Sequence, residues 1–120
     1  MKYMILTFGD QATMMQERTV DWVRSMISFM HGLYGDLKEA GELVSAEGLA
    51  DPTAAKTVRF QGGIPVPTDG PFAEAKEALA GFWIVDVASE ARALEIAARI
   101  VKFVERPIEV RQIMSAPPEL

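Results

Sequence analysis

Short apolar stretches along the chain predict the strands of this protein. Four stretches are rich in β-branched, aromatic and other apolar residues and are bounded by Gly, Pro or Asp, which is typical of strands. They cover residues 2–8, 42–47, 81–87 and 108–113. A fifth stretch, 56–61, alternates apolar and polar side chains, and Gly62-Gly63 allows the chain to turn back tightly. This pattern predicts a hairpin whose return strand lies at a sheet edge because it contains Pro65.

Hydrophobic residues at spacings of three and four predict two longer helices. The first helix ends at Gly41 and begins either at an N-cap Thr19 or at a capping box of Thr13 and Gln16. Its main apolar stripe contains Val20, Val23, Ile27, Met30, Tyr34 and Leu37, and a second stripe beside it contains Trp22, Met26, Phe29 and Leu33. Ser89 caps the second helix, which must end before Pro107. A short helix is also expected within 72–79.

The order of these elements predicts an α+β fold of the ferredoxin-like plan, an antiparallel sheet with two helices on one face. Both faces of the predicted sheet are apolar. Tyr3 and Ile5 point to one side of the first strand, whereas Met4, Leu6 and Phe8 point to the other. Since two helices cover one face only, we expect a second copy of the chain to cover the other, in a homodimer whose sheets pack face to face.

Composition narrows the function classes. The 120 residues contain no cysteine and one histidine, His31, which excludes disulfides, thiol nucleophiles and Cys-ligated metals and leaves no basis for a cofactor or metal site. The net charge of -5 argues against a nucleic-acid partner. The apolar stretches are too short for a membrane span or a signal peptide. We therefore expect one domain over 1–120 in a cytoplasmic protein.

Carboxylates at a predicted turn are the first candidates for chemistry. Asp69 and Glu74 flank the turn, and Arg59 lies on the neighbouring hairpin strand. A carboxylate in a cleft can serve as a general base, and Arg59 can anchor an anion. The structural alternatives are that Asp69 bonds the turn backbone, that Glu74 lies on a solvated face, and that Arg59 pairs with Glu47.

His31 and the tryptophans are further candidates. The imidazole of His31 suits acid–base work near neutral pH, although a hydrogen-bonded histidine on a helix flank is the more common case. Trp22 and Trp83 could form a wall on which a ligand stacks, but aromatic residues at such spacings are usually core or interface.

The run Thr68-Asp69-Gly70-Pro71-Phe72-Ala73-Glu74, with Lys76-Glu77 and the strand after Gly81, resembles the signature segment of the DGPF group of YCII-related proteins. Four further segments agree with that group. They are Met1-Lys2-Tyr3-Met4, the loop from Glu47 to Pro52, Thr57-Val58-Arg59, and Val110-Arg111. The resemblance covers nearly the whole chain and implies a ferredoxin-like fold assembled as a dimeric α+β barrel.

The resemblance implies less about activity. Members are often encoded beside extracytoplasmic-function sigma factors, which makes such a factor a candidate partner. The shorter YCII-like branch has a proposed His-Asp dyad, but His31 does not match that histidine and no aspartate stands near Glu105-Arg106-Pro107. We therefore expect a small-molecule-binding module with a pocket between sheet and helices near Asp69, lined by Arg59, Glu47, Phe72 and Trp83. The alternative is a small acid–base enzyme that uses Asp69 or Glu74, with Arg59 as anion anchor and His31 as auxiliary acid.

Overall fold

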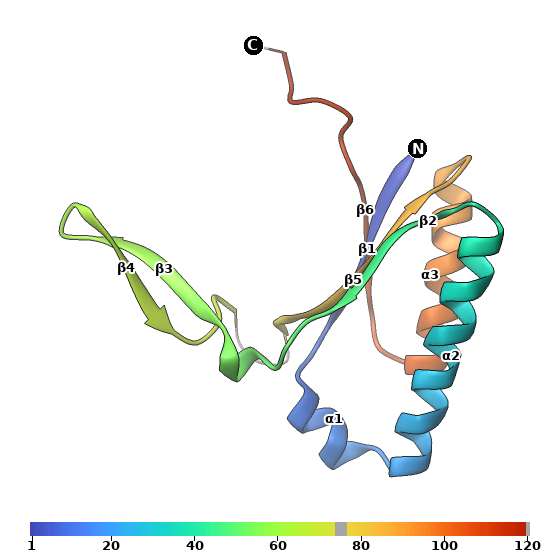
Figure 1. The fold of residues 1–120 in the computed structure, drawn as a ribbon, viewed down its shortest axis with the longest axis horizontal. Helices are drawn as coiled ribbons and strands as arrows, with labels where there is room; N and C mark the ends of the chain where they lie inside the picture. Colours follow the sequence, from blue (N-terminus) through green and yellow to red (C-terminus); the bar gives the residue numbers. More distant parts are fainter. Residues whose placement is uncertain (74–76, 120) are drawn as a thin grey trace.

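A computed structural model of the chain describes residues 1–73 and 77–119 (Figure 1). The elements are β1 (Lys2–Phe8), α1 (Gln11–Glu17), α2 (Val20–Glu39), β2 (Leu43–Gly48), a 3-10 helix (Pro52–Ala54), β3 (Lys56–Gln61), β4 (Ile64–Asp69), β5 (Leu79–Asp86), α3 (Glu90–Val104) and β6 (Glu109–Gln112). In these described ranges no helix combines the length and hydrophobicity needed to cross a bilayer. The short helix expected within 72–79 includes residues 74–76, which lie outside the described part.

Four strands form one antiparallel sheet in the order β2-β5-β1-β6. Helices α2 and α3 lie together on one side of it (Figure 1). With α1, the 3-10 helix and the β3–β4 hairpin set aside, the chain runs strand, helix, strand, strand, helix, strand. The two central strands of the sheet are the first and the third of these strands. This is the ferredoxin-like arrangement, so the predicted fold class is confirmed.

The hydrophobic core lies between the sheet and the two helices. Ile5 of β1 pairs with Trp83 of β5 and with Val110 of β6, so these three side chains share the face that the helices cover. The buried apolar residues are Tyr3, Ile5, Leu33, Leu37, Trp83, Val85, Val87, Ala93, Ile96, Ala97 and Ile100. Burial of this set, at about 25 cal/mol per Å² of apolar surface, is the main stabilising contribution to the fold.

The other face of the sheet has no helix on it in the described chain. Met4 pairs with Ile84 and Leu6 pairs with Phe82, so both pairs point to this face. All four side chains are only partly buried, in contrast to the fully buried Ile5 and Val85 of the covered face. We call the set Met4, Leu6, Phe82 and Ile84 the open face.

Helix α2 buries parts of both predicted stripes rather than the whole main stripe. Leu33 and Leu37 are fully buried, and Phe29 and Met30 pack against them. Val20, Ile27 and Tyr34 are exposed instead. The two predicted stripes are adjacent and together cover half of the helix, so periodicity alone does not determine which part faces the sheet.

Of the two predicted starts of the first helix, the one at Thr19 is a real helix start and the one at Thr13 is not. Thr19 is the N-cap of α2, and its hydroxyl accepts the Trp22 amide at 3.1 Å. The preceding residues form the separate helix α1, which is capped by Asp10 rather than by Thr13. Arg18 and Thr19 both have extended backbone conformations, and this break separates the two helices.

The β3–β4 hairpin is a separate two-stranded sheet that projects away from the body (Figure 1). It turns at Gly62-Gly63, which both have positive φ, as the sequence predicts. Its base is fixed by the Gly70 amide, which donates to the Ala55 carbonyl at 2.9 Å, and by the Thr57 hydroxyl, which donates to the Gly70 carbonyl at 2.8 Å. Apolar side chains along it, Val58, Phe60 and Ile64, are more than half exposed.

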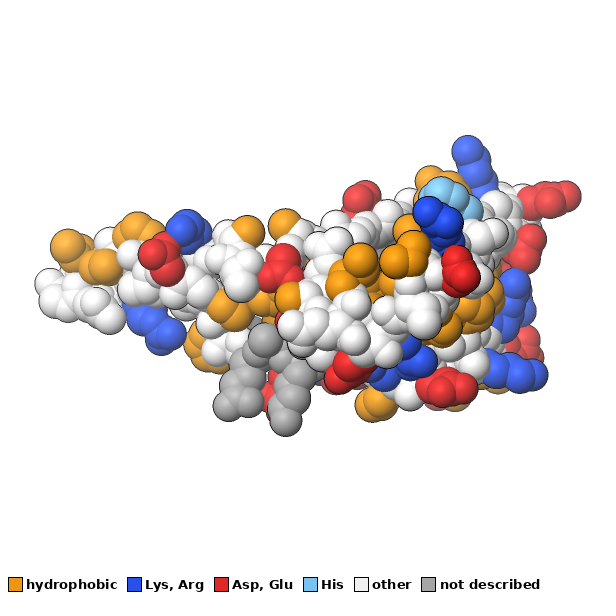
Figure 2. Space-filling view, turned by 90° about the horizontal axis from the view of Figure 1, so that it is seen from below, with side chains coloured by type: hydrophobic (Ala, Val, Ile, Leu, Met, Phe, Trp, Pro, Cys, Tyr) orange, Lys and Arg blue, Asp and Glu red, His pale blue; other side chains and the backbone are white. Residues whose placement is uncertain are grey.

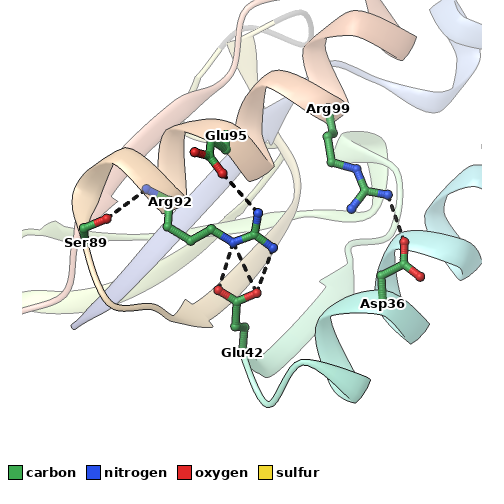
Figure 3. Close-up of polar contacts among 6 residues, drawn as sticks. All are labelled: Asp36, Glu42, Ser89, Arg92, Glu95 and Arg99. Atoms are coloured by element: carbon green, nitrogen blue, oxygen red, sulfur yellow. Dashed lines mark hydrogen bonds and ion pairs between the residues drawn. The ribbon is translucent and has the colours of Figure 1, made fainter.

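A partly buried ion pair joins the start of β2 to α3 (Figure 3). Arg92 donates from Nε and Nη2 to the carboxylate of Glu42 at 2.9 and 2.8 Å. The Glu42 side chain is 17% exposed, whereas the partners of the neighbouring Arg99–Asp36 pair are 42% and 61% exposed. The hydrogen bond from Arg92 lowers the pKa of Glu42 below its ordinary value of 4.5, although burial opposes this effect.

We expect Glu42→Gln to lower the free energy of unfolding by about 1–2 kcal/mol at pH 7, because it removes a charge-assisted hydrogen bond. The pKa of Glu42 is lower in the folded state, so its contribution is complete above about pH 5 and is lost as the pH falls through the folded-state value. Urea unfolding from pH 7 to pH 3 should show the gap to wild type closing in acid. Asp36→Asn should cost less than about 0.5 kcal/mol because its pair is exposed. A pH-independent gap for Glu42→Gln would contradict this explanation.

Candidate functional site

A cleft of about 600 Å³ opens between the sheet and the helices, at the end of the sheet where β1 and β2 finish and β5 begins. Its walls come from five parts of the chain. They are the end of β1 with α1, the α2 residues up to Tyr34, the end of β2 with the loop after it, the start of β5, and the connection from α3 to β6. A volume of this size accommodates a small organic molecule.

The wall that α2 contributes is apolar and follows a spacing of four residues. Trp22, Met26, Met30 and Tyr34 all line the cleft from one side of the helix. The Trp22 ring is fixed from behind by Phe103 of α3, with ring centroids 5.6 Å apart. Trp83 of β5 completes the wall from the sheet. Methionine and tryptophan side chains together suit flat or flexible apolar ligands.

Two carboxylates lie where α1 begins. Asp10 caps α1 by accepting the Thr13 amide at 3.2 Å. Asp51, in the loop after β2, accepts the Gln11 amide at 3.1 Å and both the amide and the hydroxyl of Thr53. The hydrogen bonds from Thr53 lower the pKa of Asp51 below its ordinary value, so it is ionised at neutral pH. Asp10 therefore stabilises the start of α1, and Asp51 fixes that start against the loop.

Two guanidinium groups lie where α1 ends. Arg18 stacks on Trp22, with Cζ 4.4 Å from the ring centroid, and donates to the Val104 carbonyl at 3.2 Å. Arg106 forms an ion pair with Glu17. The cleft is therefore polar at both ends of α1 and apolar along α2.

Three of the predicted site residues border this cleft. His31 and Trp83 line it, and Trp83 is only 7% exposed. Glu47 also borders it, but its register with Phe82 and its contact with the Ser45 hydroxyl place the Glu47 carboxylate on the opposite face of the sheet. The side chains of His31 and Trp83 therefore line the cleft, whereas the carboxylate of Glu47 does not.

The remaining predicted residues lie elsewhere. Asp69 ends β4, its side chain is 91% exposed, and it forms an ion pair with Lys56 at the hairpin base. Arg59 lies on the projecting hairpin, and the described residues contain no ion pair between it and Glu47, so the expected pairing is not formed. Phe72 is exposed and borders a separate hollow of about 590 Å³ with Phe8, Leu49 and Pro52. Glu74 lies outside the described residues.

The cleft lies between the sheet and the helices, and the Asp69 turn does not line it. Asp69, Arg59 and His31 do not come together within one chain, because the hairpin stands away from the cleft (Figure 1). Figure 2 shows the hairpin as a narrow arm that carries hydrophobic side chains beyond the body. Within residues 1–73 and 77–119, no group of three or more acidic or histidine side chains could hold a metal ion.

Sequence reasoning missed Arg18, Arg106, Asp10 and Asp51 as residues of the site. One local signal was present, because residues 18, 22, 26, 30 and 34 are spaced by four and line a single cleft. No local signal could have placed Arg106 beside them, because its approach depends on how α3 packs against α2.

Comparisons with known proteins find sequences that are similar to this chain. A family model described as "YCII-related domain" matches residues 1–116. An uncharacterized protein of Rhizobium meliloti (strain 1021) is 48% identical over 59 residues, which are 49% of this chain and 48% of that protein. The chain thus spans about half the length of the curated relative that it matches.

Proposed function

The chain belongs to the YCII-related family, and on that premise we propose that it is a dimeric small-molecule-binding module whose ligand occupies the cleft between the sheet and α2. One observation carries the proposal, a cleft of about 600 Å³ walled by two tryptophans and three methionines. Binding sites for small organic molecules are typically concave, mostly apolar and provided with a few polar groups. The run from Thr68 to Glu74 supports membership of the DGPF group.

The dimer is part of the proposal because of the open face. Four apolar side chains on the two central strands face away from α2 and α3 in the described chain. A contiguous apolar patch of this kind typically marks an interface. Packing the open face against the same face of a second copy would remove it from water with twofold symmetry, which is the commonest form of oligomer.

Two further parts of the proposal concern the cellular location and a protein partner. The absence of cysteine agrees with a cytoplasmic location. The resemblance to the DGPF group alone supports a sigma factor as partner. Co-expression of the chain with the extracytoplasmic-function sigma factor encoded nearest to it tests this part. Co-purification of the two would support the link, and their failure to associate would count against it.

Ligand binding can be tested with the neutral fluorescent probe N-phenyl-1-naphthylamine. Both tryptophans of the chain line the cleft, so the probe should quench the intrinsic fluorescence and brighten as it enters an apolar site. We expect Met26→Glu, which places a charge in the apolar wall, to weaken binding roughly tenfold or more. Met114→Glu is the matched control, because Met114 is exposed near the carboxyl end and does not line the cleft.

Circular dichroism should show that both variants are folded. Equal probe binding by the Met26→Glu and Met114→Glu variants would move the binding site away from the cleft and would contradict the proposal. A native mass spectrum of protein purified gently from its own cells would complement this test, because a retained adduct would identify the natural ligand.

A further inference from the structure

Two arginine side chains lie at one end of the cleft, and each contacts the segment from which the other comes. Arg18, between α1 and α2, donates from Nη2 to the carbonyl of Val104 at the end of α3. Arg106, just after α3, reaches in the opposite direction to Glu17 at the end of α1. Since residues 17 and 18 are consecutive and residues 104 and 106 are two apart, both guanidinium groups lie at the same corner.

Arg18 has no carboxylate partner among the described residues, since its recorded contacts are with the Trp22 ring and the Val104 carbonyl. Arg106 pairs with Glu17. Two further acids are close along the chain, because Asp10 follows Gly9 and Glu105 precedes Arg106, but neither forms an ion pair with these arginines in the described structure. The Asp10 carboxylate accepts the Thr13 amide instead. A ligand carboxylate would therefore supply the missing partner of Arg18.

The corner also has hydrogen-bond donors to spare. A guanidinium group carries five N–H donors, and the described contacts use one of Arg18 and one of Arg106. Nη1 of Arg106 lies over Gly9, 3.6 Å from the position that a Cβ atom would take there. Gly9 itself borders the cleft, so this nitrogen is at the cleft wall. Paired N–H groups of this kind match the two oxygens of a carboxylate.

The wall beside this corner is apolar, since Trp22 lies directly under Arg18 and is followed along α2 by Met26 and Met30. We propose that the cleft takes an amphipathic monoanion, with an apolar or aromatic body against α2 and a carboxylate held by Arg18 and Arg106. This inference rests on the proposed function and names the chemical class of its ligand. Any carboxylic acid whose apolar part fits the cleft would supply this negative charge.

The test compares two probes of the same shape by isothermal titration calorimetry. The anion 2-naphthoate and the neutral 2-naphthamide differ in charge but hardly in size. Because a hydrogen bond to a charged group is stronger than a neutral one, we expect 2-naphthoate to bind roughly tenfold more tightly or better. Arg106→Gln should remove most of this preference and should lower the affinity for 2-naphthamide much less, because only a neutral hydrogen bond is lost there.

Matched variants complete the test. Arg106→Lys keeps the charge but loses the planar fork, so its preference should be intermediate. Arg99→Gln removes an exposed arginine that pairs with Asp36 and does not line the cleft, and it should behave as wild type. Equal affinity of the wild type for both probes, abolished by Met26→Glu, would overturn the carboxylate inference and leave the proposed function standing. Binding of neither probe would overturn both.

Discussion

Gly81→Ala is expected to lower the free energy of unfolding by about 3 kcal/mol, near the upper end of what overpacking normally costs. A Cβ atom at this position would lie 2.7 Å from the backbone oxygen of Glu47 and 3.4 Å from the Cα of Gly48. Both atoms belong to β2, which is hydrogen-bonded to β5 at this point. Backbone in a paired strand cannot rotate away as a flexible side chain would, so the two strands must separate.

Gly48→Ala is the matched control, because Gly48 pairs with Gly81 across the same two strands but a Cβ atom there meets nothing within 4 Å. Urea unfolding monitored by circular dichroism measures both effects. The control should cost much less than Gly81→Ala. If the two variants have the same midpoint, the contact between β2 and β5 at Gly81 is not the constraint that we describe. Since Gly81 borders the cleft, Gly81→Ala should also weaken probe binding.

Ile84→Asp is expected to convert the proposed dimer into a monomer. Ile84 lies in the middle of the open face, between Met4 of β1 and Ser45 of β2. In the face-to-face assembly the two copies would bury this position, and an unpaired carboxylate there would lose its hydration without compensation. Light scattering should give about twice the chain mass of 13.2 kDa for the wild type and the single-chain mass for the variant.

The control places the same change on the opposite side of the molecule. Leu94 of α3 is also an exposed apolar residue, but it is not on the open face, so Leu94→Asp should remain a dimer. Since Ile84 is only partly buried within one chain, the Ile84→Asp monomer should keep its circular dichroism spectrum. A monomeric wild type would contradict the dimer, and a dimeric Ile84→Asp variant would place the interface on another surface.

The sequence predicted the fold well because the ferredoxin-like plan is encoded by local signals. The alternation within 56–61 and the glycine pair at the turn specify the hairpin, and Ser89 and Thr19 cap helices as expected. The boundary between α1 and α2 was harder to predict, because the break is made by two residues in extended conformation rather than by Gly or Pro. The buried stripe of α2 depends on the angle at which the helix meets the sheet, which periodicity does not contain.

The site was predicted less well, because its residues come from parts of the chain that only tertiary packing brings together. Trp83 and His31 do line the cleft, whereas Asp69 and Arg59 lie on the hairpin. The sequence placed the pocket near the Asp69 turn because candidate polar residues are close together there along the chain. In the structure β3 and β4 pair only with each other. Arg59 and Asp69 therefore lie away from the four-stranded sheet, although β2 and β5 flank the hairpin in sequence.

The four-stranded sheet has its complete strand order without β3 and β4, so the hairpin is an insertion rather than a part of the fold. Its turn at Gly62-Gly63 lines neither the cleft nor the second hollow. Mutations in the arm are therefore free of the packing constraints that act on the core, and the arm can change in length and sequence while the cleft is conserved. The hairpin and the cleft can therefore evolve independently of each other.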